Sequence, residues 1–344
     1  MKMPLLKLQG TPREVGRQYG EACREGFRAW SESSGRMVRD ERWERDVAAL
    51  RASISQLYPR FWDELVGVAE GTGLSIEQVV ANHRRTLSAA YLAEGCCTNI
   101  ALNGPDGPVF GKNLDLSPNP EMQYVIRDVT YENGQGMIHS CVVGEVTSRD
   151  TCMNVHGLTL GGSSVGSVFQ QSIHNPPIEV ALYEMLCTCA EVEEAIRFLQ
   201  RYPYVGKGYN LVLADAKGAA VVLEAASPLI QVRRRAEGED AIFCTNTYKL
   251  PALLEADLRP PHGKMYSEKR WNYLQRKVWR ERVPRTVEQM KALLSAYGPD
   301  GGLCRPIDPD DESKTRMSIV TLPAKREFWV ADGVPAFYPY ERVK

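Results

Sequence analysis

The stretch Glu94-Gly95-Cys96-Cys97-Thr98-Asn99-Ile100-Ala101 decides the fold, because it sets a pair of cysteines directly before a predicted strand at 98–102. A candidate nucleophile, Cys97, therefore stands at a strand start. A thiol is a weak nucleophile until a base takes its proton, and no histidine lies near Cys97 in the sequence. The base has to come from elsewhere.

A tight hairpin is predicted to follow this strand. Residues 103–107 are rich in turn formers and 108–111 predict a returning strand, which leads into Gly111-Lys112-Asn113-Leu114-Asp115. The hairpin would fold Asp115 back towards Cys97, so that a thiol faces a carboxylate.

Cleavage of the peptide bond before Cys97 would supply a base. The new α-amine would have a pKa of about 7.7–8, against about 10.4 for a lysine, so a usable neutral fraction would exist near pH 7. Cys97 would then carry its own general base.

Three motifs in a fixed order carry a family resemblance: Cys97-Thr98, Asn113-Leu114-Asp115 and Thr245-Asn246. They resemble the acyl-coenzyme A:6-aminopenicillanic acid acyltransferase family, also called peptidase family C45, within the N-terminal-nucleophile hydrolases. The similarity continues through residues 154–158, 209–218 and 318–335. Members of that family cleave themselves before a cysteine and have a four-layer αββα sandwich.

The resemblance implies a role for each matched residue. Cys97 would be the nucleophile, Asp115 would orient its α-amine, and Asn246 would donate to the oxyanion of the tetrahedral intermediate. Asn113 and Ser164 would support or contact the substrate. An arginine that positions the nucleophile in related bile-salt and penicillin V hydrolases is matched by Arg316. Each residue also has a structural alternative. Cys97 could be a buried thiol and Arg316 a solvated arginine at a strand end. Asp115 and Asn113 could be turn residues, and Asn246 a capping residue.

The cysteine doublet leaves the register of cleavage open. Family members show Gly-Cys, which favours Cys96, whereas the spacing of sixteen residues to Asn113 and the following Thr98 favour Cys97. We expect cleavage between Cys96 and Cys97, with Cys96 as the alternative nucleophile.

Composition limits the other classes of function. The 344 residues are 43% hydrophobic and carry a net charge of −1, which argues against nucleic-acid and anionic-membrane partners. No signal-peptide core or membrane span is visible, so a soluble cytoplasmic protein is expected. The nine cysteines are irregularly spaced and odd in number, which predicts reduced thiols and no metal site; no cofactor is implied.

The secondary-structure pattern predicts an α+β fold. Helices begin at Thr11 and Ser75, the second running to residue 92, and further helices are predicted at 178–200, 264–283 and 286–295. Strands are expected at 108–111, 124–131, 137–143, 158–162, 209–214, 219–224, 242–245, 317–322 and 327–331. We treat 1–344 as one domain of the αββα type, which would become a light fragment, 1–96, and a heavy fragment, 97–344, that stay associated.

The predicted activity is hydrolysis or transfer at a linear amide through an acyl-Cys97 thioester, with a small acyl-amide or acyl-thioester as substrate. One alternative is a choloylglycine-hydrolase-like amidase, which normally loses only a short leader. Another is a catalytically silent αββα protein that binds small amides. A papain-like order of Cys97, His156 and Asn246 is a weaker possibility, because no papain-type motif surrounds Cys97.

Overall fold

Two sheets form the centre of the protein in the computed structural model. The structure describes residues 3–35, 40–83, 97–117, 122–147, 151–168, 175–202, 204, 208–227, 229–306 and 313–344. Among these residues one sheet has eight strands, in the order β1-β4-β5-β6-β7-β8-β9-β10, and the other has six, in the order β11-β2-β3-β12-β13-β14. Of the strand pairs within the described residues, only β1–β4 is parallel.

The strands of the eight-stranded sheet are β1 Leu5–Gly10, β4 Tyr124–Tyr131, β5 Gly136–Val142, β6 Thr151–Asn154, β7 Thr159–Ser164, β8 Tyr209–Ala214, β9 Ala220–Ala226 and β10 Leu229–Arg234. Those of the six-stranded sheet are β2 Thr98–Gly104, β3 Gly107–Leu116, β11 Ala241–Cys244, β12 Lys314–Leu322, β13 Glu327–Ala331 and β14 Glu341–Arg342. The predicted strands are therefore confirmed within a few residues. β1, β6, β10 and β14 were not predicted, because their sequences are short or largely polar.

The two sheets pack face to face through apolar side chains. Phe110 of β3 lies with Val212 of β8 and Val222 of β9 in one cluster, and Leu114 lies with Ile138 of β5 in another. Alternate residues of each strand point into this interface, as the period of two requires. The interface forms the middle of the molecule.

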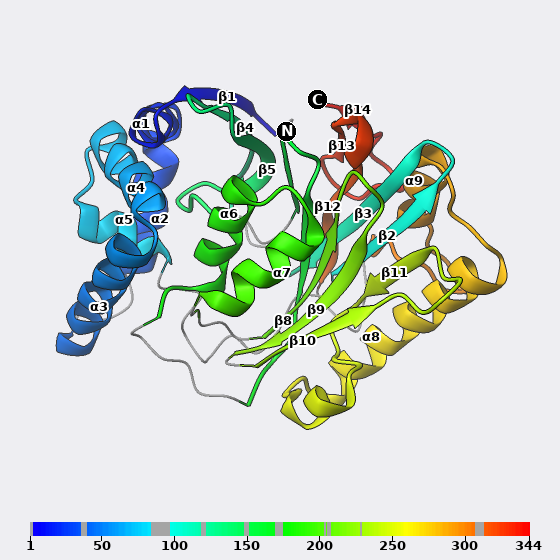
Figure 1. Ribbon diagram of the computed structural model, residues 1–344. Helices are drawn as coiled ribbons and strands as arrows, with labels where there is room; N and C mark the ends of the chain where they lie inside the picture. The colour runs from blue at the N-terminus through cyan, green and yellow to red at the C-terminus, as the bar shows by residue number, and fades with distance from the viewer. Residues whose placement is uncertain are drawn as a thin grey trace.

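Helices cover the outer faces of both sheets (Figure 1). Helices α6 Ile178–Thr188 and α7 Val192–Arg201 pack on the eight-stranded sheet. Helix α8 Pro261–Leu274, its π-helical continuation η3 Gln275–Arg280, and α9 Val287–Ser295 cover the six-stranded sheet. The layer order is helix, sheet, sheet, helix, which confirms the predicted αββα sandwich.

The N-terminal helices form a group beside the edge of the eight-stranded sheet. They are α1 Pro12–Ala22, α2 Arg24–Gly35, α3 Glu41–Leu57, α4 Pro59–Thr72 and α5 Ile76–Asn82. Gly16 and Gly67 let α1 and α4 cross closely, since a Cβ at either would lie 2.0 Å from a main-chain oxygen of the other helix. The predicted capping boxes at Thr11 and Ser75 are confirmed. The rest of the helix expected to reach residue 92 lies outside the described residues beyond His83.

Two predicted helices differ from the structure. The helix expected at 178–200 is two helices, because the chain becomes extended at Cys189, and Asn154 Nδ2 donates to the main-chain oxygens of Leu186 and Cys189 at 2.9 and 2.7 Å. Those bonds satisfy carbonyls that a continuous helix would use. No glycine or proline marks this break. The helix expected at 264–283 begins earlier, at Pro261, and turns π-helical at Gln275.

Candidate functional site

The β2–β3 hairpin brings the predicted residues to one end of the six-stranded sheet. In its register Thr98 pairs with Asn113, and on the far side of β3 Asp115 pairs with Thr315 of β12. The neighbouring strand β11 pairs Cys244 with Asn99 and then leads into Asn246. The hairpin expected from the sequence is therefore confirmed, and it collects segments that are distant along the chain.

Cys97 precedes β2 by one residue and is buried, with 5% of its surface exposed. Its side chain packs in the apolar cluster between the sheets, beside Leu114. Its Sγ lies 3.8 Å from the main-chain oxygen of Asp115. The main-chain oxygen of Cys97 accepts two hydrogen bonds, from Ser163 Oγ at 3.1 Å and from Arg270 at 2.7 Å. The main chain at Cys97 is therefore fixed from both sides.

The Asp115 carboxylate lies on the opposite face of the sheet from the Cys97 side chain. Successive residues of a strand alternate faces, and Asp115 shares its face with Asn113 and hence with Thr98. Its Oδ1 accepts from Thr315 Oγ1 at 2.7 Å, and its Oδ2 is buried without a hydrogen-bond partner in the structure. The carboxylate is thus held on the face of β3 that it shares with Asn113, bonded to β12, whereas the sequence predicts that it faces the thiol.

Burial makes the Asp115 carboxylate costly to ionise. Desolvation raises its pKa from 3.8 to about 6, although the positive charge of Arg270 and the Thr315 hydrogen bond both act to lower it. A cationic amine near the unpartnered Oδ2 would favour the ionised form.

Asn246 follows β11 and is fully buried. Its Oδ1 accepts from Arg270 at 3.0 Å and its Nδ2 donates to the main-chain oxygen of Ser164 at 2.8 Å. Because a guanidinium only donates, the amide oxygen has to face Arg270 and the Nδ2 group has to face away. The main-chain amide of Asn246 donates to Ser267 Oγ at 3.0 Å. The amide donor is therefore held in one orientation.

Arg270 of α8 connects these residues and was not predicted. One terminal nitrogen donates to the main-chain oxygen of Cys97 and to Thr98 Oγ1 at 2.7 and 2.8 Å, and the other donates to Asn246. Arg270 is 4% exposed, and its Nε has no hydrogen-bond partner. The signal that could have found it is the spacing Ser267-x-x-Arg270, which places both side chains on one face of a helix.

Asn113, Ser164 and Arg316 lie around this centre with different contacts. Asn113 Nδ2 donates to the main-chain oxygens of Leu294 and Leu303, so it ties β3 to the helical layer. Ser164 contributes its main-chain oxygen to Asn246 and Arg259, and the neighbouring Ser163 supplies the hydroxyl that meets Cys97.

Arg316 is directed elsewhere. It lies 3.6 Å from the Asp332 carboxylate and over the ring of Tyr124. Within the described residues it forms no hydrogen bond or ion pair with Cys97, Asp115 or Asn246. Its position in the β12 bulge, between Thr315 and Met317, accounts for the different direction. Cys96, the other side of the expected cleavage site, lies outside the described residues.

His156 lies at the β6–β7 turn, away from this cluster. Its Nε2 is 3.1 Å from Gln135 Oε1 at an exposed position. Ser163, which contacts Cys97, is near the other end of β7, and the four steps along the strand from Thr159 to Ser163 span about 13 Å. A papain-like arrangement with His156 is therefore not formed.

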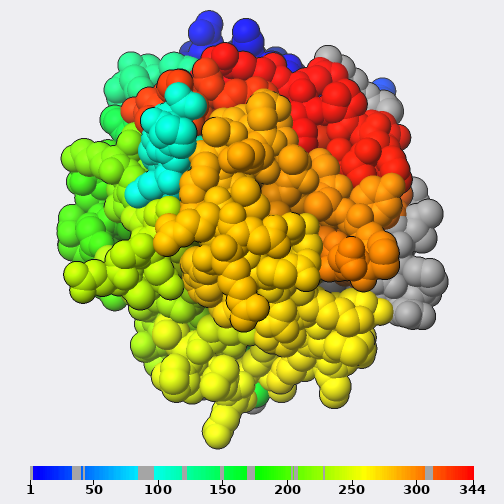
Figure 2. All heavy atoms as spheres, turned by 90° about the vertical axis from the view of Figure 1, so that its right-hand side faces the viewer, coloured from blue at the N-terminus to red at the C-terminus, as the bar shows by residue number. Residues whose placement is uncertain are grey.

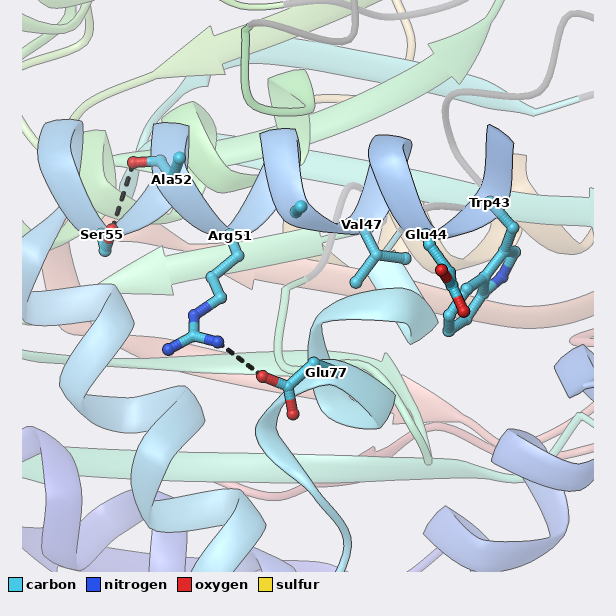
Figure 3. Close-up of a pocket in the computed structure, with 8 residues that line it drawn as sticks. Trp43, Glu44, Val47, Arg51, Ala52, Ser55 and Glu77 are labelled. Atoms are coloured by element: carbon cyan, nitrogen blue, oxygen red, sulfur yellow. Dashed lines mark hydrogen bonds and ion pairs between the residues drawn. The ribbon is translucent and has the colours of Figure 1, made fainter. Parts of the chain in front are cut away.

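A cavity lies on the N-terminal helices, apart from the Cys97 cluster. It has a volume of about 480 Å³ and runs along α3 beside α5. In Figure 3 Arg51 points across it to Glu77, with an Nη1 to Oε1 distance of 2.6 Å, and Trp43 stands at one end. None of the predicted site residues lines it.

Among the described residues, no helix combines the length and apolar character needed to cross a membrane.

The site and the fold together define the class. Two largely antiparallel sheets between helical layers carry a cysteine directly before a strand, and a buried carboxylate lies on the same hairpin. Arg270 joins the main-chain oxygen of this cysteine to a fixed amide group. This is the organisation of an N-terminal-nucleophile hydrolase.

Comparison with known proteins identifies the family. The model of the acyl-coenzyme A:6-aminopenicillanic acid acyl-transferase family matches residues 102–300, more than half of the chain. The chain belongs to this family. The matched range includes Asp115 and Asn246 and begins after Cys97. The family assignment confirms the one drawn from the three ordered motifs.

Individual relatives are distant. The acyl-coenzyme A:6-aminopenicillanic-acid-acyltransferase 40 kDa form of Emericella nidulans is 26% identical over 116 residues, which cover 31% of this chain and about a third (32%) of that protein. A variant of the conjugated bile acid hydrolase from Clostridium perfringens is 13% identical, with 72% of this chain and 92% of that chain covered and a TM-score of 0.49. Penicillin V acylase from Agrobacterium tumefaciens is 16% identical, with 69% of this chain and 83% of that chain covered and a TM-score of 0.44.

Proposed function

We propose that the chain cleaves itself between Cys96 and Cys97 and then catalyses acyl transfer from a linear amide through an acyl-Cys97 thioester. The observation that carries this proposal is the convergence on the main chain at Cys97: Arg270 binds both its carbonyl oxygen and Asn246, and the Asp115 carboxylate lies beside the same hairpin. Among the described residues no histidine takes part in this arrangement, which favours the new α-amine as the base.

Maturation proceeds by an acyl shift. The Cys97 thiol loses its proton and its sulphur attacks the carbonyl carbon of Cys96, while the Cys97 nitrogen leaves and takes up a proton. The product is a thioester and a free α-amine. Water then adds to the thioester, giving the Cys96 carboxylate and the free Cys97 thiol. This sequence needs no reactant other than water.

Catalysis by the mature enzyme repeats these steps on a small-molecule substrate. The α-amine accepts the thiol proton, sulphur attacks the substrate carbonyl, and the tetrahedral oxyanion accepts a hydrogen bond from Asn246 Nδ2. Collapse releases the amine, which is protonated by the α-ammonium group. Water or an acceptor amine then takes the acyl group from Cys97, so hydrolysis and acyl transfer differ only in the acceptor.

The described contacts support the proposal that the two fragments stay together. Strand β1 of the proposed light fragment pairs with β4 of the heavy fragment, and Glu64 of α4 forms a buried ion pair with Arg127 at 2.5 Å. Tyr131 and Tyr183 donate to the same carboxylate. Separation would expose this surface and leave charges unpaired.

Intact-mass measurement of the purified protein tests the proposal. The expected result is two fragments, 1–96 and 97–344, that co-elute under native conditions. Incubation with a chromogenic acyl anilide should add the acyl mass to the heavy fragment and release the aniline. A single chain that remains uncleaved and takes up no acyl group would overturn the proposal. A light fragment ending at Gly95 would instead identify Cys96 as the nucleophile.

A further inference from the structure

A cationic cavity opens on the α8 side of the candidate site. It has a volume of about 590 Å³ and lies between helix α8 with η3 and the segment 298–305. In Figure 2 these segments, coloured yellow to orange, lie next to one another on the face that the view presents. Its charged lining consists of four cationic side chains and one acidic side chain: Lys269, Arg270, Arg276, Arg305 and Asp300.

Two of the guanidinium groups are built into the protein. Arg270 is 4% exposed and Arg305 is 8% exposed, so both are largely removed from water. Among the described residues, no carboxylate oxygen lies within ion-pair distance of Arg270. Its guanidinium donates to the main-chain oxygen of Cys97, the hydroxyl of Thr98 and the amide oxygen of Asn246. The hydrogen bonds of Arg270 therefore go to neutral acceptors, and the Asp115 carboxylate lies near enough for the positive charge of Arg270 to lower its pKa.

The other two cations stand at the accessible part of the cavity. Lys269 and Arg276 are exposed on α8 and η3, and their charged ends lie over the rings of Tyr266 and Tyr273, respectively. The aromatic rings pack against these side chains, and Arg276 also pairs with Glu281, with an Nε to Oε1 distance of 3.7 Å. The cavity is therefore lined by two buried arginine side chains and by two exposed cationic side chains, each of which lies over a tyrosine ring.

We infer that this cavity binds an oxyanion group, a carboxylate or a phosphate, and that this group is part of the substrate of the proposed acyl transfer. The inference rests on the proposed function in one respect: Arg270 lines the cavity and also contacts Cys97 and Asn246. An anion there would compensate the guanidinium that fixes the reacting segment. Planar guanidinium groups bind carboxylate and phosphate oxygens with good geometry. A free anion is the other source of the same chemistry.

Binding is tested first without catalysis. Inorganic phosphate and acetate are titrated calorimetrically at low ionic strength into the full-length Cys97→Ala protein, into the same protein with Lys269→Gln and Arg276→Gln, and into a control with Arg280→Gln. Arg280 is exposed on the same helix and does not line the cavity. The paired substitution should weaken anion binding about 10-fold or more, and the control should not. Equal phosphate and acetate binding in all three proteins, or none in any, overturns the inference.

Substrate pairs then identify the source of the anion. Wild-type enzyme is given an N-acylglycine and the corresponding N-acylglycinamide, and a glutaryl and a pentanoyl amide of one amine. A KM about 10-fold lower for the anionic member of either pair, lost in Arg276→Gln and kept in Arg280→Gln, supports a substrate anion. Anion binding without such discrimination assigns the cavity to a free anion and overturns the substrate part of the inference. Because the calorimetric arm needs no turnover, it can succeed or fail independently of the proposed acyl transfer.

Discussion

Two buried arginine clusters in this molecule use similar groups in different ways. Arg127 of β4 is fully buried and lies 2.5 Å from the Glu64 carboxylate, with the ring of Tyr19 stacked 4.3 Å from its guanidinium carbon. Arg270 of α8 is almost as deeply buried, yet it contacts carbonyl and hydroxyl oxygens and no carboxylate. The first charge is compensated within the fold, whereas the second is directed at the main chain of Cys97.

This difference separates a structural cluster from a candidate catalytic one. A compensated ion pair joins elements and leaves no charge to act on another molecule. A guanidinium whose hydrogen-bond partners are neutral costs free energy to bury, and it can be stabilised further by negative charge that develops or binds during a reaction. Substitutions in the two clusters should therefore affect different measurements.

The largest expected effect is at Cys97, through which the Arg270 cluster would act. Cys97→Ala should abolish both chain cleavage and acyl transfer, while the fold and the Arg127 cluster persist. Cys96→Ala should retain a working thiol and slow cleavage at most. Both variants are checked by intact mass and by release of a chromogenic amine; activity in Cys97→Ala would remove it from the mechanism.

Selective alkylation adds a chemical control to this pair. Burial raises the pKa of both Cys244 and Cys304 to about 11, so these thiols should stay unreactive to iodoacetamide near neutral pH. Labelling at residue 97 in the cleaved form, and its loss in Cys97→Ala, is the expected pattern.

The next largest effect is on stability, in the compensated cluster. Glu64→Gln removes the only carboxylate within hydrogen-bond distance of Arg127 in the described chain and leaves a buried charge unpaired. The free energy of unfolding should fall by about 3–5 kcal/mol. Urea denaturation in the uncleaved Cys97→Ala background measures this loss.

The matched control is Glu70→Gln on the same helix. Glu70 pairs with Arg13 at an exposed position, so its substitution should change stability little. An equal fall in the free energy of unfolding in the two variants would show that the buried ion pair stabilises the fold no more than the exposed one. In the cleaved enzyme Glu64→Gln should also weaken association of the fragments.

A smaller effect is expected for the oxyanion donor. Asn246→Ala should lower kcat by about 10²–10³ with little change in KM, because Nδ2 is proposed to bind the developing charge rather than the ground state. Asn133, a turn residue at an exposed position, provides an alanine control. A near-wild-type kcat in Asn246→Ala would exclude its side chain from the oxyanion site.

Local sequence signals predicted much of this structure. The caps at Thr11, Ser75 and Thr286 and the β2–β3 hairpin follow from short-range preferences, which the tertiary fold did not override. The break at Cys189 was invisible because its cause, Asn154, is a distant residue. Local patterns report what a segment prefers, and long-range contacts decide where it ends.

The site was only partly predictable for the same reason. Asp115 and Asn246 were proposed because a family pattern fixes their order, but strand alternation places the Asp115 carboxylate away from the thiol. Arg270 and Ser163 were missed, since each stands in a segment without a motif and approaches Cys97 only through packing of α8 and β7. The sequence identified the strand that follows the proposed nucleophile, whereas the residues that contact its main chain come from other layers.

The smallest expected effect, and the one that most sharpens the comparison, is the pH dependence contributed by Asp115. Its folded pKa of about 6 exceeds the ordinary value of 3.8, so the folded chain binds this proton more tightly than the unfolded chain. The free energy of unfolding should therefore fall as pH rises from about 4 to 6, by about 3 kcal/mol for this group. Asp115→Asn retains an acceptor for Thr315 and cannot ionise, so that fall should be absent.

Urea denaturation of Cys97→Ala, with and without Asp115→Asn, at several pH values between 4 and 7 measures this difference. The pKa of Asp257 is also raised by burial, but that group is present in both proteins and cancels in the difference. Stability of Asp115→Asn relative to its parent should rise with pH and level off above about 6. Parallel curves would show that Asp115 does not titrate in this range. In the cleaved enzyme a protonated α-amine beside the carboxylate should lower its pKa, so the same comparison should give a smaller, more acidic transition if Asp115 partners that amine.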